Sequence, residues 1–429
     1  MKKVIASAGL LALGAVGVQT AQAEFAAGAE KPWTIAGTLR GFYDDNYNTE
    51  PDGPLRHGSF GFEVRPSASV NYAVGATTLN ASYTYSMKYY DDRPGNKADQ
   101  SHDFEFYLNH AFNERYTLDF EESFVISQEP EVLDRGLSAP LRANGDNIRN
   151  NAAVNFHAQL TKLLGIVLGY SNTYYDYTGN AAAQLPGQAS YGNLLNRDEQ
   201  TVLFNTRWQL AEQTVGILGY KFEAVNYLNS GSINGIGLPF FSPKTRDNYS
   251  HFAYVGVEHS FRSDLSFSGR AGAQVVDYYN LPSNSNPGTV SPYVDLSLNY
   301  TYMDSGTLVV GLSHKKNQTD VSGLDVSQAG GVTPDQESST LYGSIVQTLT
   351  PLSPKLTATL TGQYQNSVYN GGGANGEVDN FYLLGLNFAY QFTKYISGEV
   401  GYNYDLLDSQ LQGRGYDRNR VYVGVTASY

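Results

Sequence analysis

The strongest constraint on the fold is an alternation of apolar and polar residues with a period of two, repeated along nearly the whole chain. About 18 segments of roughly 10 to 15 residues show it. In one of them, Leu79, Ala81 and Tyr83 fall on one face of an extended strand, and Asn80 and Ser82 fall on the other. Because successive side chains of a strand point to opposite sides of a sheet, this pattern predicts strands with one apolar and one polar face. The sequence therefore predicts an all-β protein.

The segments are joined alternately by short turns and by longer polar loops. Turns such as 74–77 and 113–115 alternate with loops such as 129–146, 229–248 and 318–337. This layout is typical of outer-membrane barrels, which have short periplasmic turns and longer extracellular loops. We therefore predict a single transmembrane antiparallel up-and-down β-barrel of about 18 strands (16–18), with loops long enough to fold inward and narrow its passage.

The cost of unpaired backbone groups explains why such a sheet should close and lie in a membrane. An open edge invites aggregation in water, and in lipid each unpaired group costs several kcal/mol. Tyr occurs 34 times and Phe 20 times, with Tyr clustered toward segment ends, as in the aromatic belts at membrane interfaces. A soluble sandwich or propeller explains the alternation but not the regular exchange of turns and loops.

The first residues read as a cleaved export signal. Lys2 and Lys3 precede an apolar stretch, and Ala21 and Ala23 are the small residues of a small-x-small cleavage site that ends at Ala23. We expect residues 1–23 to be removed and residues 24–429 to form the barrel domain. The chain has no Cys, which excludes disulfides and thiolate metal sites, and its net charge of −13 argues against nucleic acid as a partner.

The end of the chain is a fully patterned strand. Val423, Val425, Ala427 and Tyr429 lie on one face of it. This ending resembles the C-terminal signal by which the barrel-assembly machinery recognises outer-membrane proteins, and the whole mature chain resembles the outer-membrane β-barrel porins. The resemblance implies a location in the cell outer membrane, among lipid and lipopolysaccharide. We expect the last strand to close the barrel against the first, near 33–43.

If the apolar rows face lipid, the opposite rows face the interior. The charged residues predicted to face the lumen are Arg40, Glu63, Arg65, Lys88, Asp103, Glu105, Asp119, Glu121, Arg207, Lys221, Glu223, Arg270, Asp295, Glu399 and Arg420. A barrel of this width holds a water-filled passage unless something plugs it. Glu122 breaks the pattern, because it falls on the apolar row of Phe120 and Phe124. Either a bulge changes the facing there, or Glu122 lies near a membrane interface.

These features favour a porin-like channel that passes small hydrophilic solutes. The main alternative is an outer-membrane export pore of a polysaccharide or other secretion system, working with periplasmic export components; lumen-facing Tyr90 and Tyr107 are compatible with sugar contact. A surface-structural barrel and a rim hydrolase are further alternatives. His102 and Asp103 are adjacent and so point to opposite faces, and no GxSxG or HExxH motif occurs. We predict no catalytic, cofactor-binding or metal site, and the sequence leaves the oligomeric state open.

Overall fold

The computed structural model describes residues 31–127, 147–177, 195–229, 242–281, 290–303, 305–319, 321 and 333–429. The export signal predicted at 1–23 and the whole loop at 129–146 lie outside these ranges and stay predictions. The described residues form 18 strands joined by turns and loops.

The first nine strands are β1 (Trp33–Asp44), β2 (Ser59–Val74), β3 (Thr77–Tyr90), β4 (Ala98–Ala111), β5 (Tyr116–Ser127), β6 (Asn147–Gln159), β7 (Leu164–Tyr177), β8 (Arg197–Ala211) and β9 (Thr214–Tyr227). The other nine are β10 (Asn248–Arg262), β11 (Leu265–Asp277), β12 (Val290–Tyr302), β13 (Gly306–Asn317), β14 (Asp335–Thr348), β15 (Leu356–Asn370), β16 (Val378–Gln391), β17 (Ile396–Ser409) and β18 (Tyr416–Ser428). Within the described parts of the loops lie two short 3-10 turns, η2 (Pro243–Arg246) and η3 (Gly372–Ala374).

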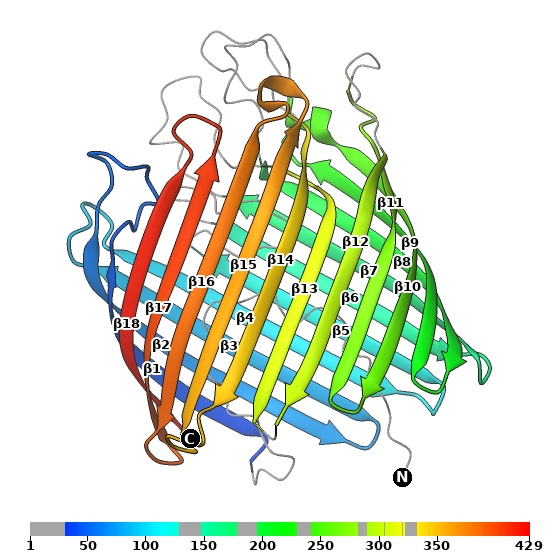
Figure 1. Ribbon diagram of the computed structural model, residues 1–429, viewed down its shortest axis with the longest axis horizontal. Helices are drawn as coiled ribbons and strands as arrows, with labels where there is room; N and C mark the ends of the chain where they lie inside the picture. Colours follow the sequence, from blue (N-terminus) through cyan, green and yellow to red (C-terminus); the bar gives the residue numbers. More distant parts are fainter. Residues whose placement is uncertain are drawn as a thin grey trace.

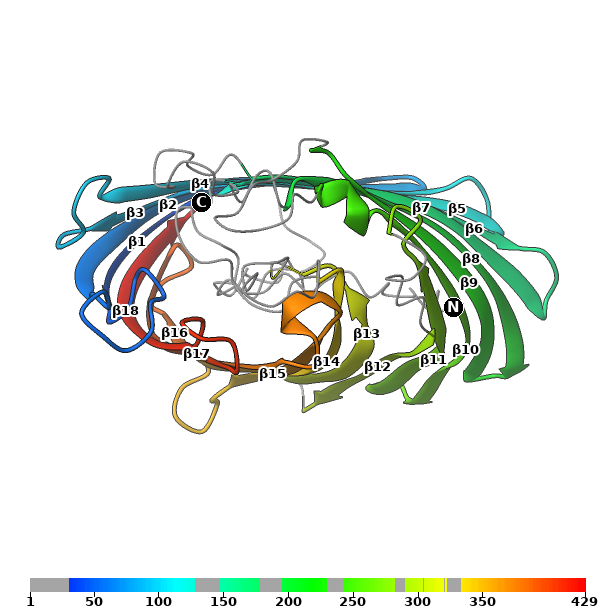
Figure 2. The same ribbon diagram turned by 90° about the horizontal axis from the view of Figure 1, so that it is seen from above.

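Each strand pairs antiparallel with the next one along the chain, and the last strand pairs with the first. The closing pair of β18 and β1 runs from Ala36 opposite Ser428 to Asp44 opposite Arg420. The sheet therefore has no free edge, and Figure 2 shows the strands arranged in a closed ring. The prediction of a single closed, antiparallel up-and-down barrel of about 18 strands is confirmed, as is the pairing of its first and last strands.

The strands run obliquely between two different ends (Figure 1). At one end, which we call the turn end, tight connections such as 75–76 and 212–213 join neighbouring strands. The same end holds the start of β1 and the end of β18, where the Tyr429 N–H donates to the Ile35 carbonyl at 2.9 Å. Most connections at the opposite end, the loop end, are longer.

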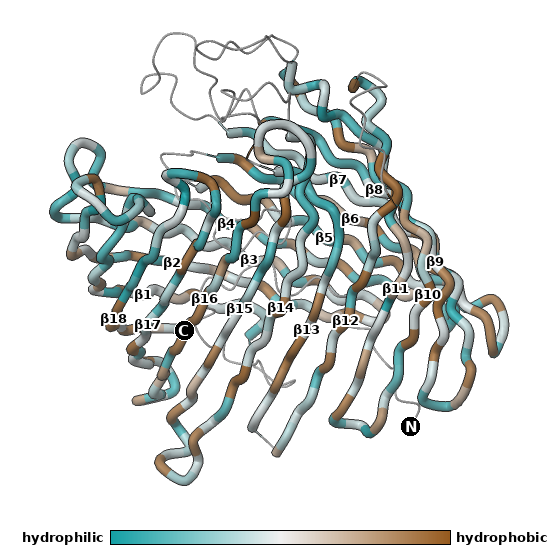
Figure 3. The backbone as a smooth tube through the Cα atoms, turned by 45° about the horizontal axis from the view of Figure 1, so that its top comes forward, coloured by the Kyte–Doolittle hydropathy of each residue, from teal (hydrophilic) through white to brown (hydrophobic). Residues whose placement is uncertain are grey.

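The alternation in the sequence separates the two faces of the wall. Leu39 is 59% exposed and Val423 is 63% exposed. Arg40, the residue after Leu39 in β1, is only 7% exposed. Along the strands in Figure 3, brown apolar and teal polar stretches accordingly alternate. No helix among the described residues is long and apolar enough to cross a membrane.

Candidate pore wall

Contacts that skip a strand identify the inner face of the wall. Side chains on a concave surface converge, so residues two strands apart can meet there, whereas on the convex outer surface they diverge. The Arg40 Nε of β1 donates to Glu399 Oε1 of β17 at 2.6 Å, passing over β18. The face that carries Arg40 is therefore the inner face, and the exposed apolar rows form the outer face.

The register places every charged residue predicted to face the lumen on this inner face. Arg40 stands opposite Glu63, which stands opposite Lys88, and on the other side of the barrel Arg270 stands opposite Asp295. Pairing ties the others to the same face. Whether they meet a passing solute stays a prediction.

The inner face carries a buried ion cluster across the barrel's closing seam. Arg40 lies between two carboxylates, with its Nη1 3.0 Å from Glu63 Oε2 and its Nε 2.6 Å from Glu399 Oε1. Ser86 donates to Glu63 at 2.7 Å, and the guanidinium lies 4.8 Å from the centre of the Tyr422 ring. Sequence reasoning found these charges, but it did not show that they neutralise one another.

Glycines on intervening strands make the strand-skipping contacts possible. A Cβ on Gly424, which lies between Arg40 and Glu399, would stand 2.7 Å from Arg40 Cγ. The same arrangement recurs across β9, where the Tyr254 hydroxyl donates to Asn205 Oδ1 at 2.7 Å over Gly219. A Cβ on Gly219 would stand 2.2 Å from the Tyr254 ring. These glycines keep the inner wall free of a side chain where two neighbours must meet.

Most other charges of the inner wall are also paired within the wall. The ion pairs include Arg207 and Arg270 with Glu258, Lys221 with Glu223, Arg197 with Glu199, and Arg420 with Asp405, and His157 Nε2 lies 2.8 Å from Asp119 Oδ2. Three carboxylates differ. Within the described residues, exposed Glu105 accepts only a long hydrogen bond from Ser82, at 3.5 Å, and Glu121 and Asp295 take part in no side-chain hydrogen bond or ion pair. The wall is therefore strongly polar, and many but not all of its charges are paired.

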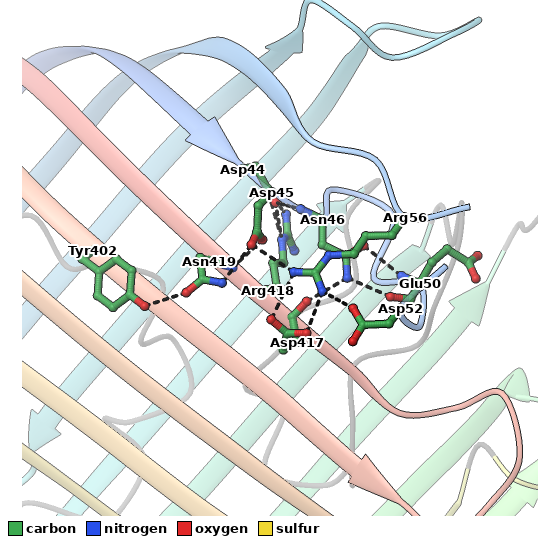
Figure 4. Close-up of polar contacts among 10 residues, drawn as sticks. All are labelled: Asp44, Asp45, Asn46, Glu50, Asp52, Arg56, Tyr402, Asp417, Arg418 and Asn419. Atoms are coloured by element: carbon green, nitrogen blue, oxygen red, sulfur yellow. Dashed lines mark hydrogen bonds and ion pairs between the residues drawn. The ribbon is translucent and has the colours of Figure 1, made fainter. Parts of the chain in front are cut away.

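A second cluster joins the two faces of the wall at the loop end of the seam (Figure 4). On the inner side, Arg418 bonds Asp44 with both Nε and Nη2. On the outer side, Arg56 of the first loop donates to Asp417 at 2.7 Å and to Asp45 at 3.0 Å. The hydrogen bond to Asp417 raises the pKa of Arg56 above its ordinary value, so its charge persists at any physiological pH. These bonds fasten the first loop to β18.

The interior is packed more tightly toward the loop end than toward the turn end. Near the loop end, Arg197, Tyr227 and Tyr369 on the inner face are at most 1% exposed. The guanidinium of Arg246, in η2, stacks 4.0 Å from the Tyr227 ring centre and donates to the Thr319 carbonyl at 3.1 Å. Arg246 thus joins the described parts of the loops at 229–248 and 318–337 to the end of β9. Whether these loops narrow the passage stays a prediction.

The sugar-contact role suggested for Tyr90 is not available in this arrangement. Tyr90 is 1% exposed and its ring packs 5.3 Å from that of Phe42 and 5.5 Å from that of Tyr47. Tyr107 is partly exposed, and its hydroxyl donates to Asp119 at 3.2 Å. The structure therefore argues against sugar stacking by Tyr90, whereas Tyr107 keeps part of its surface exposed.

Glu122 lies on the outer face, and neither explanation offered from sequence accounts for it. The pairing of β5 with β4 and with β6 is continuous from Thr117 to Ser127, so no bulge changes the facing. Glu122 also lies near the middle of β5, away from both strand ends. Its carboxylate accepts a hydrogen bond from the Asn150 amide of β6.

Within the described part of the chain, no group of three or more His, Asp or Glu side chains is arranged to hold a metal ion. His102, considered above for a rim hydrolase, points outward and bonds the Tyr83 hydroxyl at 2.9 Å. The chemistry that the described site offers is therefore a polar, hydrogen-bonding wall around a central space.

Comparisons with solved structures find barrels at low sequence identity. OccAB4 of Acinetobacter baumannii is 13% identical, with 93% of this chain and 99% of that chain covered and a TM-score of 0.45. The outer membrane protein OpdK of Pseudomonas aeruginosa is 10% identical, with 92% and 99% covered and a TM-score of 0.44. The siderophore receptor PirA of the same organism is 12% identical, with 92% and 80% covered and a TM-score of 0.39.

No curated protein matches the chain. A family model does match: residues 331–429 fit the family described as Putative beta-barrel porin 2. The matched residues include β14 to β18, and with them Glu399, Arg420 and the terminal strand. The resemblance to the β-barrel porins is thereby confirmed for the segment that forms the last five strands of the barrel.

Proposed function

We propose that the protein is an outer-membrane channel through which small hydrophilic solutes cross along a polar inner wall. The observation that carries this proposal is the contrast between the two faces of a closed barrel. Apolar side chains stand exposed on the outer face, where lipid would solvate them, and hydrogen-bonded polar side chains cover the inner face. Such a wall suits water and polar solutes.

The charge pattern of the inner wall favours weak selectivity for the sign of the solute charge. Arg40 lies between Glu63 and Glu399, and Glu258 lies between Arg207 and Arg270. Paired charges present little net field to a passing ion, whereas a row of one sign would select strongly. The packed loop end then sets the size limit, and small neutral or zwitterionic solutes are the class we expect to pass.

The test is planar-bilayer conductance of the purified mature chain with ions and sugars of graded size. We expect discrete channels, little discrimination between small anions and cations, and a size cutoff for sugars. A folded, inserted barrel that carries no current would contradict the proposal. Passage of large polysaccharides would instead favour an export pore.

A further inference from the structure

The outer face of the barrel carries a band of polar residues that the proposed channel does not use. It consists of Glu122 on β5, Asn150 on β6, Asn172 on β7, and Asp198 and Gln200 on β8, which we call the outer polar strip. Pairing places Glu122, Asn172 and Gln200 in one row with Ala152, and Asn150 and Asp198 in the row above. The strip is therefore continuous across four neighbouring strands.

The members of the strip form two hydrogen-bonded groups, one on β5 and β6 and one on β7 and β8. Asn150 donates to Glu122, Asn172 donates to Asp198 Oδ1 at 2.5 Å, and Gln200 donates to Asp198 Oδ2 at 2.8 Å. Among the described residues, Glu122 Oε2 and the Asn150 side-chain carbonyl take no further hydrogen bond. The strip thus keeps free acceptors as well as free amide N–H groups.

Apolar side chains lie on both sides of the strip at its β5 and β6 end. Phe120 and Val154 lie toward the turn end, and Phe124, Ile126 and Ile148 lie toward the loop end. Glu122 and Asn150 therefore stand inside the apolar band of the outer wall and not at its edge. An ionisable residue at membrane depth is costly when it faces lipid, and normally it has a polar partner.

We propose that the outer polar strip is the contact surface for a second copy of this chain in the membrane. The inference rests on the proposed membrane location of the barrel. The strip contains amides that donate and carboxylates that accept, so two copies related by a two-fold axis can place the amides of one against the carboxylates of the other. Anionic lipid headgroups fit the strip less well, because the two carboxylates carry the same negative charge as the headgroups. Lipid acyl chains would leave the remaining donors and acceptors of the strip without partners.

The shape of the wall agrees with such a contact. Seen from above, the side that contains β4 to β7 is flat, whereas the side that contains β14 to β17 is curved (Figure 2). Flat walls can meet over several strands. The rings that border the strip, including Phe104 at 39% and Tyr170 at 44% exposure, would supply the apolar part of the interface.

Because the chain has no Cys, an introduced thiol is unique and can report the contact. The Asn150→Cys and Asn172→Cys variants would be purified and reconstituted in lipid vesicles. Each would then be treated with a short thiol-to-thiol cross-linker. The matched control is Asn366→Cys on the opposite wall, where Asn366 donates to Asn380 at 2.9 Å in another outward-facing amide pair. The proposal predicts covalent dimers from the strip and none from the control.

A second variant tests the role of the polar groups. The double substitution Glu122→Leu and Asn150→Leu should abolish the dimers reported by Asn172→Cys while leaving the barrel folded, and Asn366→Leu with Asn380→Leu should leave them unchanged. The proposal would be overturned if no strip position gave cross-linked dimers. It would also be overturned if the strip and the control positions gave the same yield of dimer. Current measured from the same vesicles separates the two claims: channels without dimers refute only the contact, whereas folded barrels without current refute the proposed function.

Discussion

The wall around the closing seam and the wall of β5 to β8 distribute polar residues differently. At the seam, Arg40, Glu63 and Glu399 are buried on the inner face, and the outer face carries apolar residues such as Leu39 and Val423. In β5 to β8 the inner face is polar too, but Glu122 and Asn150 make the outer face polar as well. Strict alternation is the signature of a wall with water on one side and lipid on the other, so the broken alternation indicates a different neighbour.

The largest effect is expected from breaking the buried ion cluster at the seam. Arg40→Met leaves the Glu63 and Glu399 carboxylates buried without the cation that they share, and we expect it to destabilise the barrel by about 3–5 kcal/mol. The measurement is the shift of the unfolding midpoint in urea. The heat-dependent mobility of the barrel on gels reports the folded fraction at each urea concentration.

The matched change in the other wall is Asp119→Asn, which removes the carboxylate that lies 2.8 Å from His157 Nε2 on a partly exposed part of the inner face. It should cost less than about 1 kcal/mol, since water solvates both groups. Equal costs for the two variants would mean that the seam cluster is not buried from water as the structure has it.

An arginine introduced on the outer face tests more directly whether the two walls have different surroundings. Ala68→Arg lies on the outer face of β2 near mid-strand, and it should cost about 2–4 kcal/mol by placing a cation in the hydrocarbon layer. Its neighbour Ser67→Arg points inward and should fold normally. Ala152→Arg stands directly opposite Glu122 on the outer face of β6 and should cost less than Ala68→Arg.

These three variants are compared by the fraction of barrel that folds into lipid vesicles. If Ala68→Arg and Ser67→Arg fold equally well, the assignment of inner and outer faces fails. If Ala152→Arg is as damaging as Ala68→Arg, the outer polar strip faces lipid after all.

A smaller effect is expected from replacing a glycine that lets side chains of the two flanking strands meet across it. Gly219→Ala brings a Cβ within 2.2 Å of the Tyr254 ring, and we expect a loss of about 1–3 kcal/mol from overpacking and from the displaced hydrogen bond to Asn205. Gly424→Ala at the seam should also be destabilising, because its Cβ would stand 2.7 Å from Cγ of Arg40, whose guanidinium is held by Glu63 and Glu399. Gly37→Ala, which meets nothing within 4 Å, is the control and should be close to neutral. Urea unfolding ranks the three, and a reversed order would contradict the inner-wall packing.

Much of the fold could be predicted from sequence because it follows from local pattern. The period of two gives the facing of each strand, and the alternation of turns and loops gives the antiparallel order. The register of the closing pair, by contrast, brings Arg40 and Glu399 together from opposite ends of the chain. No local pattern encodes that contact, and the space for it depends on Gly424 in a third strand.

The exceptional position of Glu122 was visible in the sequence, but its explanation was not. The hydrogen bond from Asn150 depends on the register of β5 with β6, which are joined by a loop too long to fix that register. The packing at the loop end was likewise hidden, since Arg246 meets Tyr227 and Thr319 through contacts between loops.

The account rests on one claim: the polar face of the wall lines an open aqueous passage, and the apolar face does not. Two adjacent residues of β4 test it, exposed Glu105 on the inner face and Phe104, 39% exposed on the outer face. Single channels of Glu105→Cys and Phe104→Cys would be recorded before and after addition of a charged, water-soluble thiol reagent. We predict a step decrease in conductance for Glu105→Cys and no change for Phe104→Cys. A change in Phe104→Cys alone, or the same response from both, would contradict the account.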